Sequence, residues 1–225
     1  MGITVEMFAK EFIIKDIPVL KTFDTVEYVL TLMDDFKLRH LPVVNEGLYQ
    51  GLLSEHELLA ITSPQNKIGS LGFLALSVSE NANLNDILSQ MTRYNVDILP
   101  VVTAEGMYKG AITCKRLIDI LSDLLNVDTE GSIVVLEVAP QDYLLSDISR
   151  IVESNNARII NMYSQQDNNT GRLLITIKMN VEDASPVIRS FERFNYSILY
   201  HFMKQGAVDE LLQQRMNELL HYMNL

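Results

Sequence analysis

The chain has 225 residues, of which 48% are hydrophobic and 21% charged, as in globular proteins with one large or two small cores. Its formal net charge of −11 disfavours nucleic acid and anionic membranes as partners. The sequence has no apolar run of roughly 20 residues and no signal peptide at its start, and its single cysteine, Cys114, excludes an intramolecular disulfide. We therefore expect a cytoplasmic protein that binds neither nucleic acid nor membranes.

The first 62 residues predict alternating helices and strands. Residues 1–15 predict a short helix leading into the first strand, and Asp24, with Glu27 three positions later, predicts the N-cap of a second helix. Ser54 predicts the cap of a third. Strands are expected at 18–20, 41–44 and 48–53. A tight turn at Gly47 joins the second and third of these strands.

The same order of elements then occurs a second time. Residues 39–44 read RHLPVV and residues 97–102 read DILPVV, with their prolines 58 positions apart. Similarity at a fixed offset indicates a duplicated structural unit. In the second copy Asn83 and Thr113 predict helix caps, and residues 62–72 link the copies.

After residue 131 the pattern changes. The expected elements, in the order β-α-β-β-α-β of the ferredoxin-like plan, are strand 132–139, helix 142–155, strands 157–165 and 172–179, a helix with Pro186 in its first turn and strand 196–203. A last helix is predicted within residues 206–225, with an apolar seam of Leu212, Met216, Leu219 and Met223. This seam either docks on a neighbouring part of the chain or forms a subunit contact.

Three features resemble the CBS domain. They are the helix start at Asp24-Thr25, the LPVV strands, and the sequence of a glycine, two apolar residues and a hydroxyl residue that follows each LPVV strand. Two copies resemble a Bateman module, with repeat one at about 10–62 and repeat two at about 72–125 of a pair spanning 1–127. Residues 157–162 resemble a strand of an ACT domain spanning 131–204, and the order CBS–CBS–ACT resembles the acetoin-utilisation regulatory family. The resemblance implies a mixed α/β (α+β) fold in which two CBS repeats pack as a pseudo-twofold pair with two clefts, followed by the ACT-like domain and the C-terminal helix.

The resemblance also implies a binding site. In nucleotide-binding CBS pairs a hydroxyl and the following helix start meet phosphate, a carboxylate three residues later binds the ribose hydroxyls, and the Leu-Pro strand faces adenine. The corresponding positions here are His40, Pro42, Ser54, Glu57, Ile98, Pro100, Thr113 and Arg116. Glu57 keeps a carboxylate in the first copy, whereas Arg116 has no acceptor for a ribose.

Each copy has an alternative interpretation. Ser54 and Glu57 form a capping-box sequence, which is complete without a ligand. Thr113 and Arg116 either hold a phosphate or carboxylate at the helix start, or Lys115 and Arg116 are two solvated side chains that lean away from it. In the ACT-like domain, Tyr143 stands near the turn where amino-acid-binding relatives have glycine, which favours a dimerising role.

No catalytic motif or metal-ligand spacing is present, so we expect neither an enzyme nor a metal protein. The leading hypothesis is a regulatory sensor, a homodimer that binds AMP, ADP, ATP or S-adenosylmethionine between the repeats and signals to a regulated enzyme or transporter. The alternative is a ligand-free assembly module that oligomerises through the same surfaces.

Overall fold

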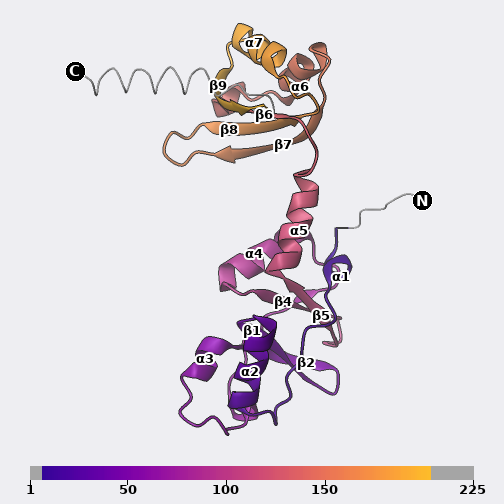
Figure 1. Cartoon of the computed structure of the whole chain (residues 1–225), viewed down its shortest axis with the longest axis vertical. Helices are drawn as coiled ribbons and strands as arrows, with labels where there is room; N and C mark the ends of the chain where they lie inside the picture. The colour runs from indigo at the N-terminus through magenta and orange to yellow at the C-terminus, as the bar shows by residue number, and fades with distance from the viewer. Residues whose placement is uncertain (1–6, 204–225) are drawn as a thin grey trace, which may run out of the picture. The chain divides into compact units, whose positions relative to one another are not determined.

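The computed structural model describes residues 7–203 and divides the chain into two compact units, Met1–Leu121 and Ser122–Leu225 (Figure 1). The helix predicted within residues 206–225 lies outside the described residues. The first unit contains the following elements, of which the last helix runs three residues into the second unit. They are α1 (Ala9–Phe12), α2 (Val26–Phe36), β1 (His40–Asn45), β2 (Leu48–Ser54), α3 (Glu55–Leu59), η1 (Ile68–Ser70), β3 (Val78–Ser79), α4 (Leu84–Tyr94), β4 (Ile98–Val102), β5 (Tyr108–Thr113) and α5 (Cys114–Leu124).

The two LPVV stretches are the buried strands β1 and β4, each paired antiparallel with the next strand along the chain. Glu46 and Gly47 both have positive φ, as a two-residue hairpin turn that matches strand twist requires. Side chains of both repeats belong to one continuous hydrophobic core. The predicted duplication is therefore a single folded body with a shared core.

The repeats meet at symmetry-related positions. The Tyr49 N–H donates to the Gly106 carbonyl at 3.0 Å, and the Tyr108 N–H donates to the Gly47 carbonyl at 2.9 Å. The rings of Tyr49 and Tyr108 are stacked, with their centroids 6.3 Å apart. Gly47 and Tyr49 occupy the same places in the first repeat as Gly106 and Tyr108 in the second, so these reciprocal contacts confirm the predicted pseudo-twofold arrangement.

The first helix cap differs from the prediction. The side chain of Thr25, not Asp24, accepts the cap hydrogen bond of α2, from the N–H of Tyr28. The Asp24 carboxylate instead accepts from the N–H of Lys21 at 2.7 Å, which turns the chain directly after Leu20. The strand predicted at 18–20 is thereby reduced to a single bridge between Leu20 and Val43, and the first sheet has two assigned strands where the second has three.

The short helix predicted near the start of the chain is α1, and its segment packs on the second repeat. The N–H of Ala9 donates to the Ala82 carbonyl at 2.8 Å, and Ile14 bridges to Ala111 of β5. The segment between the repeats does the same for the first repeat, where Leu74 bridges to Leu52 of β2. The chain before α2 thus packs on the second repeat, and the chain between the repeats packs on the first.

The second unit has the predicted β-α-β-β-α-β plan. Its elements are β6 (Ser132–Val138), η2 (Pro140–Asp142), α6 (Leu145–Ser154), β7 (Ile159–Gln166), β8 (Leu173–Met179), α7 (Ser185–Arg193) and β9 (Ser197–Phe202), with the sheet order β7-β8-β6-β9. Helices α6 and α7 cover one face of this sheet and enclose its core (Figure 1). Helix α6 begins at Leu145, later than predicted, because residues 140–142 form a 3-10 turn.

Candidate functional site

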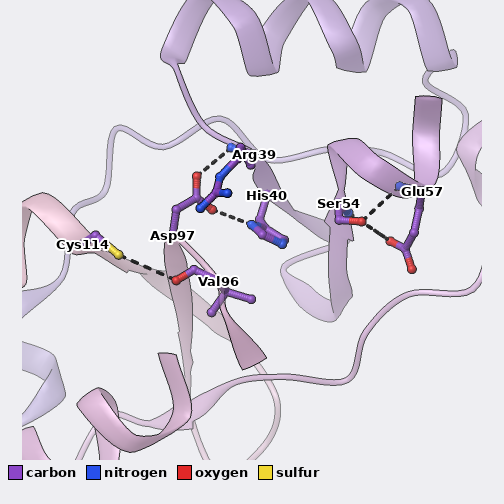
Figure 2. Close-up of polar contacts among 7 residues, drawn as sticks. All are labelled: Arg39, His40, Ser54, Glu57, Val96, Asp97 and Cys114. Atoms are coloured by element: carbon purple, nitrogen blue, oxygen red, sulfur yellow. Dashed lines mark hydrogen bonds and ion pairs between the residues drawn. The ribbon is translucent and has the colours of Figure 1, made fainter. Parts of the chain in front are cut away.

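Each repeat has a hydroxyl residue that joins its last strand to its last helix. Ser54 caps α3 and closes a capping box, in which its Oγ accepts from the Glu57 N–H at 3.2 Å. The Glu57 Oε2 in turn accepts from the Ser54 N–H at 3.1 Å and from its Oγ at 2.8 Å (Figure 2). Thr113 caps α5 by accepting from the Arg116 N–H at 3.1 Å. The predicted caps, Ser54 and Thr113, and the capping box of Ser54 and Glu57 are therefore confirmed.

Glu57 also lines an open hollow of about 360 Å³. The other lining residues are Ile61, Leu71, Gly72, Phe73 and Leu74. Leu52 and Leu74 exchange hydrogen bonds of 2.9 and 2.8 Å, which hold this wall against β2. Gly51 permits the approach, since its φ is +147° and a Cβ there would lie 2.5 Å from the Cβ of Phe73. The sequence pattern predicts only a linker here, so it does not reveal this wall.

A polar pair joins the two repeats beside these helix starts. His40 Nδ1 lies 2.6 Å from Asp97 Oδ1, and the Arg39 N–H donates to Asp97 Oδ2 at 2.6 Å (Figure 2). Both side chains are nearly buried, with 14% of His40 and 15% of Asp97 exposed. Burial acts to raise the pKa of Asp97, but the hydrogen bonds from His40 and Arg39 outweigh it and leave that pKa below its usual value.

The backbone of this pair reaches both helices. The Arg39 carbonyl accepts from the N–H of Glu55, the first residue of α3, at 2.8 Å. The Asp97 carbonyl accepts from the N–H of Cys114, the first residue of α5, at 2.9 Å. Arg39 and Asp97 are therefore one hydrogen bond away from the start of each helix. Sequence reasoning does not single out Asp97, although its opposite charge at the position equivalent to Arg39 is a usable signal.

The remaining predicted residues have different surroundings. Pro42, Ile98 and Pro100 are buried within β1 and β4, with Ile98 wholly in the core, so they can offer a ligand only backbone. Arg116 is half-buried in the first turn of α5. The Cys114 thiol donates to the Val96 carbonyl at 3.7 Å, and its pKa is raised by burial and by Asp97, which disfavours the nucleophilic thiolate.

The second unit has a cavity of about 340 Å³ near the start of α6. Both arginines that line it are paired with carboxylates, Arg150 with Asp147 at 3.2 Å and Arg172 with Glu137 at 3.1 Å. Tyr143, whose bulk at its turn predicts a dimerising role over amino-acid binding, packs against the core of the unit. Within residues 7–203 no helix is long and apolar enough to cross a membrane, and no cluster of three His, Cys, Asp or Glu could hold a metal ion.

The chain is similar to proteins of Methanocaldococcus jannaschii and Thermotoga maritima. An uncharacterised protein of Methanocaldococcus jannaschii is 25% identical over an alignment 224 positions long, which covers 87% of this chain and 74% of that protein. The inosine-5'-monophosphate dehydrogenase of the same organism is 27% identical over 112 residues, which are 49% of this chain but only 23% of the enzyme. A CBS domain pair/ACT domain protein of Thermotoga maritima has a TM-score of 0.49 and 22% identity, over 53% of this chain and 99% of that protein.

The family model of the CBS domain matches two segments, 9–63 and 75–123. These segments contain both capped helix starts, the hairpins β1-β2 and β4-β5, and the His40–Asp97 pair. The two matched segments also contain the RHLPVV and DILPVV copies and the two stacked tyrosines, Tyr49 and Tyr108. Residues 9–63 and 75–123 of this chain are a tandem pair of CBS domains.

Proposed function

We propose that the CBS pair is a regulatory sensor for an adenine nucleotide or a related anionic metabolite. CBS pairs serve regulatory rather than catalytic roles, and the observation that supports binding here is the position of Glu57. Its carboxylate borders a hollow of about 360 Å³, next to the capped start of α3. A carboxylate at such an edge can accept hydrogen bonds from both hydroxyls of a ribose.

The second repeat supplies the complement for a negatively charged group. Arg116 lies in the first turn of α5, an eleven-residue helix whose N-terminus attracts anions. A phosphate or carboxylate held there by Arg116 and Thr113 would offset the unfavourable placement of a cation at that end. The two repeats thus offer different groups, an acceptor in one and a cation in the other.

Signalling requires that the ligand prefer one arrangement of the protein. Asp97 and Arg39 connect the starts of α3 and α5 by single hydrogen bonds, so a ligand that shifts one helix start acts on the other. We propose that this shift changes the association of subunits in a homodimer, and that a regulated enzyme or transporter reads the change.

A ligand-free assembly module is the second candidate. It is favoured by the closed capping box, in which Ser54 and Glu57 already satisfy each other. The ring of His40 is likewise already engaged by Asp97. In this alternative the CBS pair and the second unit serve only to join copies of the chain.

Thermal denaturation with AMP, ADP, ATP and S-adenosylmethionine separates the two candidates. A ligand at a hundredfold excess over its dissociation constant stabilises the native state by about 2.7 kcal/mol, which is a shift of several degrees. Glu57→Gln is the informative variant, because glutamine keeps the capping box but loses the carboxylate. Glu55→Gln, which removes a charge from the same helical turn, is the matched control.

We expect at least one of the four compounds to raise the melting temperature of the wild type and of Glu55→Gln, and to lose this effect in Glu57→Gln. Arg116→Ala should weaken binding and reduce its dependence on salt, as loss of an ion pair does. Absence of a shift with all four compounds, in a protein of constant mass by light scattering, would favour the assembly module.

A further inference from the structure

The sheet of the second unit has one face that its helices do not cover. Register places Tyr163, Thr176, Val135 and Tyr200 side by side across the four strands. The adjacent row consists of Asn161, Lys178, Ile133 and Phe202. Along β6 and β8 the core residues under α6 and α7 alternate with these, and the register carries the same faces to β7 and β9, each of which has a bulge. Both rows therefore lie on the opposite face, here called the outer face.

The outer face carries exposed aromatic side chains. Phe202 is 60% exposed, Tyr163 48% and Tyr200 39%, and the rings of Tyr200 and Phe202 pack edge to face at 5.6 Å. One side of the face is bordered by the end of α5 and the chain that follows it. Asn161 donates to the Leu124 carbonyl at 2.6 Å, and Lys178 donates to the Val127 carbonyl at 3.3 Å. Val135, between Thr176 and Tyr200, is buried, so the exposed apolar area lies on the rings of Tyr163, Tyr200 and Phe202. Exposed aromatic side chains gathered on one face mark a binding surface.

We propose that residues 207–223 of the same chain cover the outer face. Their sequence places Leu212, Met216, Leu219 and Met223 on one side of a predicted helix, with polar residues such as Gln213 and Arg215 between them. A helix of that length would be about 25 Å long, enough to cross four strands spaced about 4.8 Å apart.

The place where the chain leaves the sheet argues for the same molecule rather than a second copy. Phe202, the last residue of β9, is itself part of the outer face, and residue 207 follows five positions later. So short a connection gives the segment an effective concentration on the order of millimolar at this surface. Aliphatic side chains against exposed Tyr and Phe rings would remove apolar area from water on both sides.

A single tryptophan tests the proposal, because the chain has none of its own. In the full-length protein, Leu219→Trp places the probe in the apolar seam and Asn217→Trp places it two positions away, on the polar side. We expect Leu219→Trp to emit at shorter wavelength and to be quenched less by iodide than Asn217→Trp. Adding Phe202→Ser or Tyr163→Ser to Leu219→Trp should abolish the difference, with the fold checked by circular dichroism.

Three outcomes would overturn the proposal. Equal quenching of the two tryptophan probes would show that the seam is not buried. Protection of the Leu219→Trp probe that survives both serine substitutions would place the segment on another surface. Protection that disappears on dilution, together with a fall in mass by light scattering, would assign the outer face to a second copy of the chain.

Discussion

His40 and Asp97 belong to different CBS repeats, and their side chains form a hydrogen bond of 2.6 Å between Nδ1 and Oδ1. The same carboxylate accepts from the backbone of Arg39, the residue to which Asp97 corresponds in the duplicated sequence. One acidic side chain of the second repeat therefore fastens the beginning of β1. Its removal leaves a nearly buried histidine and a backbone N–H without their acceptor.

We expect Asp97→Ala to lower the free energy of unfolding of the CBS pair by about 2 kcal/mol, since hydrogen bonds to charged groups contribute on that scale. Hydrogen exchange of amides in residues 7–121 isolates the effect from the second unit. The control is Asp34→Ala, which removes an ion pair whose two side chains are 77% and 79% exposed, and it should change stability by less than about 0.5 kcal/mol. Equal effects of the two variants would contradict the proposed role of Asp97.

Acid should destabilise the CBS pair through the same residue. The pKa of Asp97 in the folded protein lies below its usual value, so the unfolded chain takes up the proton first as the pH falls. The stabilisation is complete above the pKa of the unfolded chain and is lost as the pH falls through the pKa of the folded one. Urea unfolding between about pH 6 and pH 2 should show a smaller decline in stability for Asp97→Asn than for the wild type. Parallel declines would refute the assignment.

Much of the fold is predictable from the sequence because the same pattern of strands, turns and helix caps occurs twice in the chain. The apolar LPVV runs, the glycine turns and the capping residues Ser54, Asn83 and Thr113 each predict one local element, and each is confirmed. The ferredoxin-like plan of the second unit follows from its alternating pattern in the same way.

Contacts between residues that are distant in the sequence cannot be predicted from the local sequence pattern. Asp24 and Thr25 are both favourable N-cap residues. Thr25 is the cap because the Asp24 carboxylate accepts a hydrogen bond from the N–H of Lys21 instead. The docking of the N-terminal segment on β5 and of Leu74 on β2 depends on contacts between distant residues. For the candidate site, the residue types are predictable but the hollow beside Glu57 is not, since its wall comes from residues 71–74.

Gly51 should be required for that wall. Gly51→Ala places a Cβ where φ is +147° and Phe73 is 2.5 Å away, so we expect a loss of at least about 1 kcal/mol of stability. Gly72→Ala lies in the same wall but would meet no atom within 4 Å, and its φ is outside the left-handed region. It should be neutral or stabilise the protein by up to about 1 kcal/mol. Thermal denaturation compares the two variants directly. Similar melting temperatures would show that residues 71–74 can move to accommodate a Cβ at position 51.

The two equivalent tyrosines, Tyr49 and Tyr108, should respond differently to the loss of their hydroxyls. The Tyr49 hydroxyl donates to the Leu76 carbonyl at 2.6 Å, whereas the buried hydroxyl of Tyr108 has no hydrogen-bond partner among the described residues. Tyr49→Phe leaves a carbonyl unsatisfied and should cost about 1 kcal/mol, whereas Tyr108→Phe removes an unpaired polar group and should be neutral or stabilising. Both variants keep the stacked rings, so the difference in their urea midpoints measures the hydroxyls alone. Equal losses in the two would mean that Tyr108 has a partner in solution.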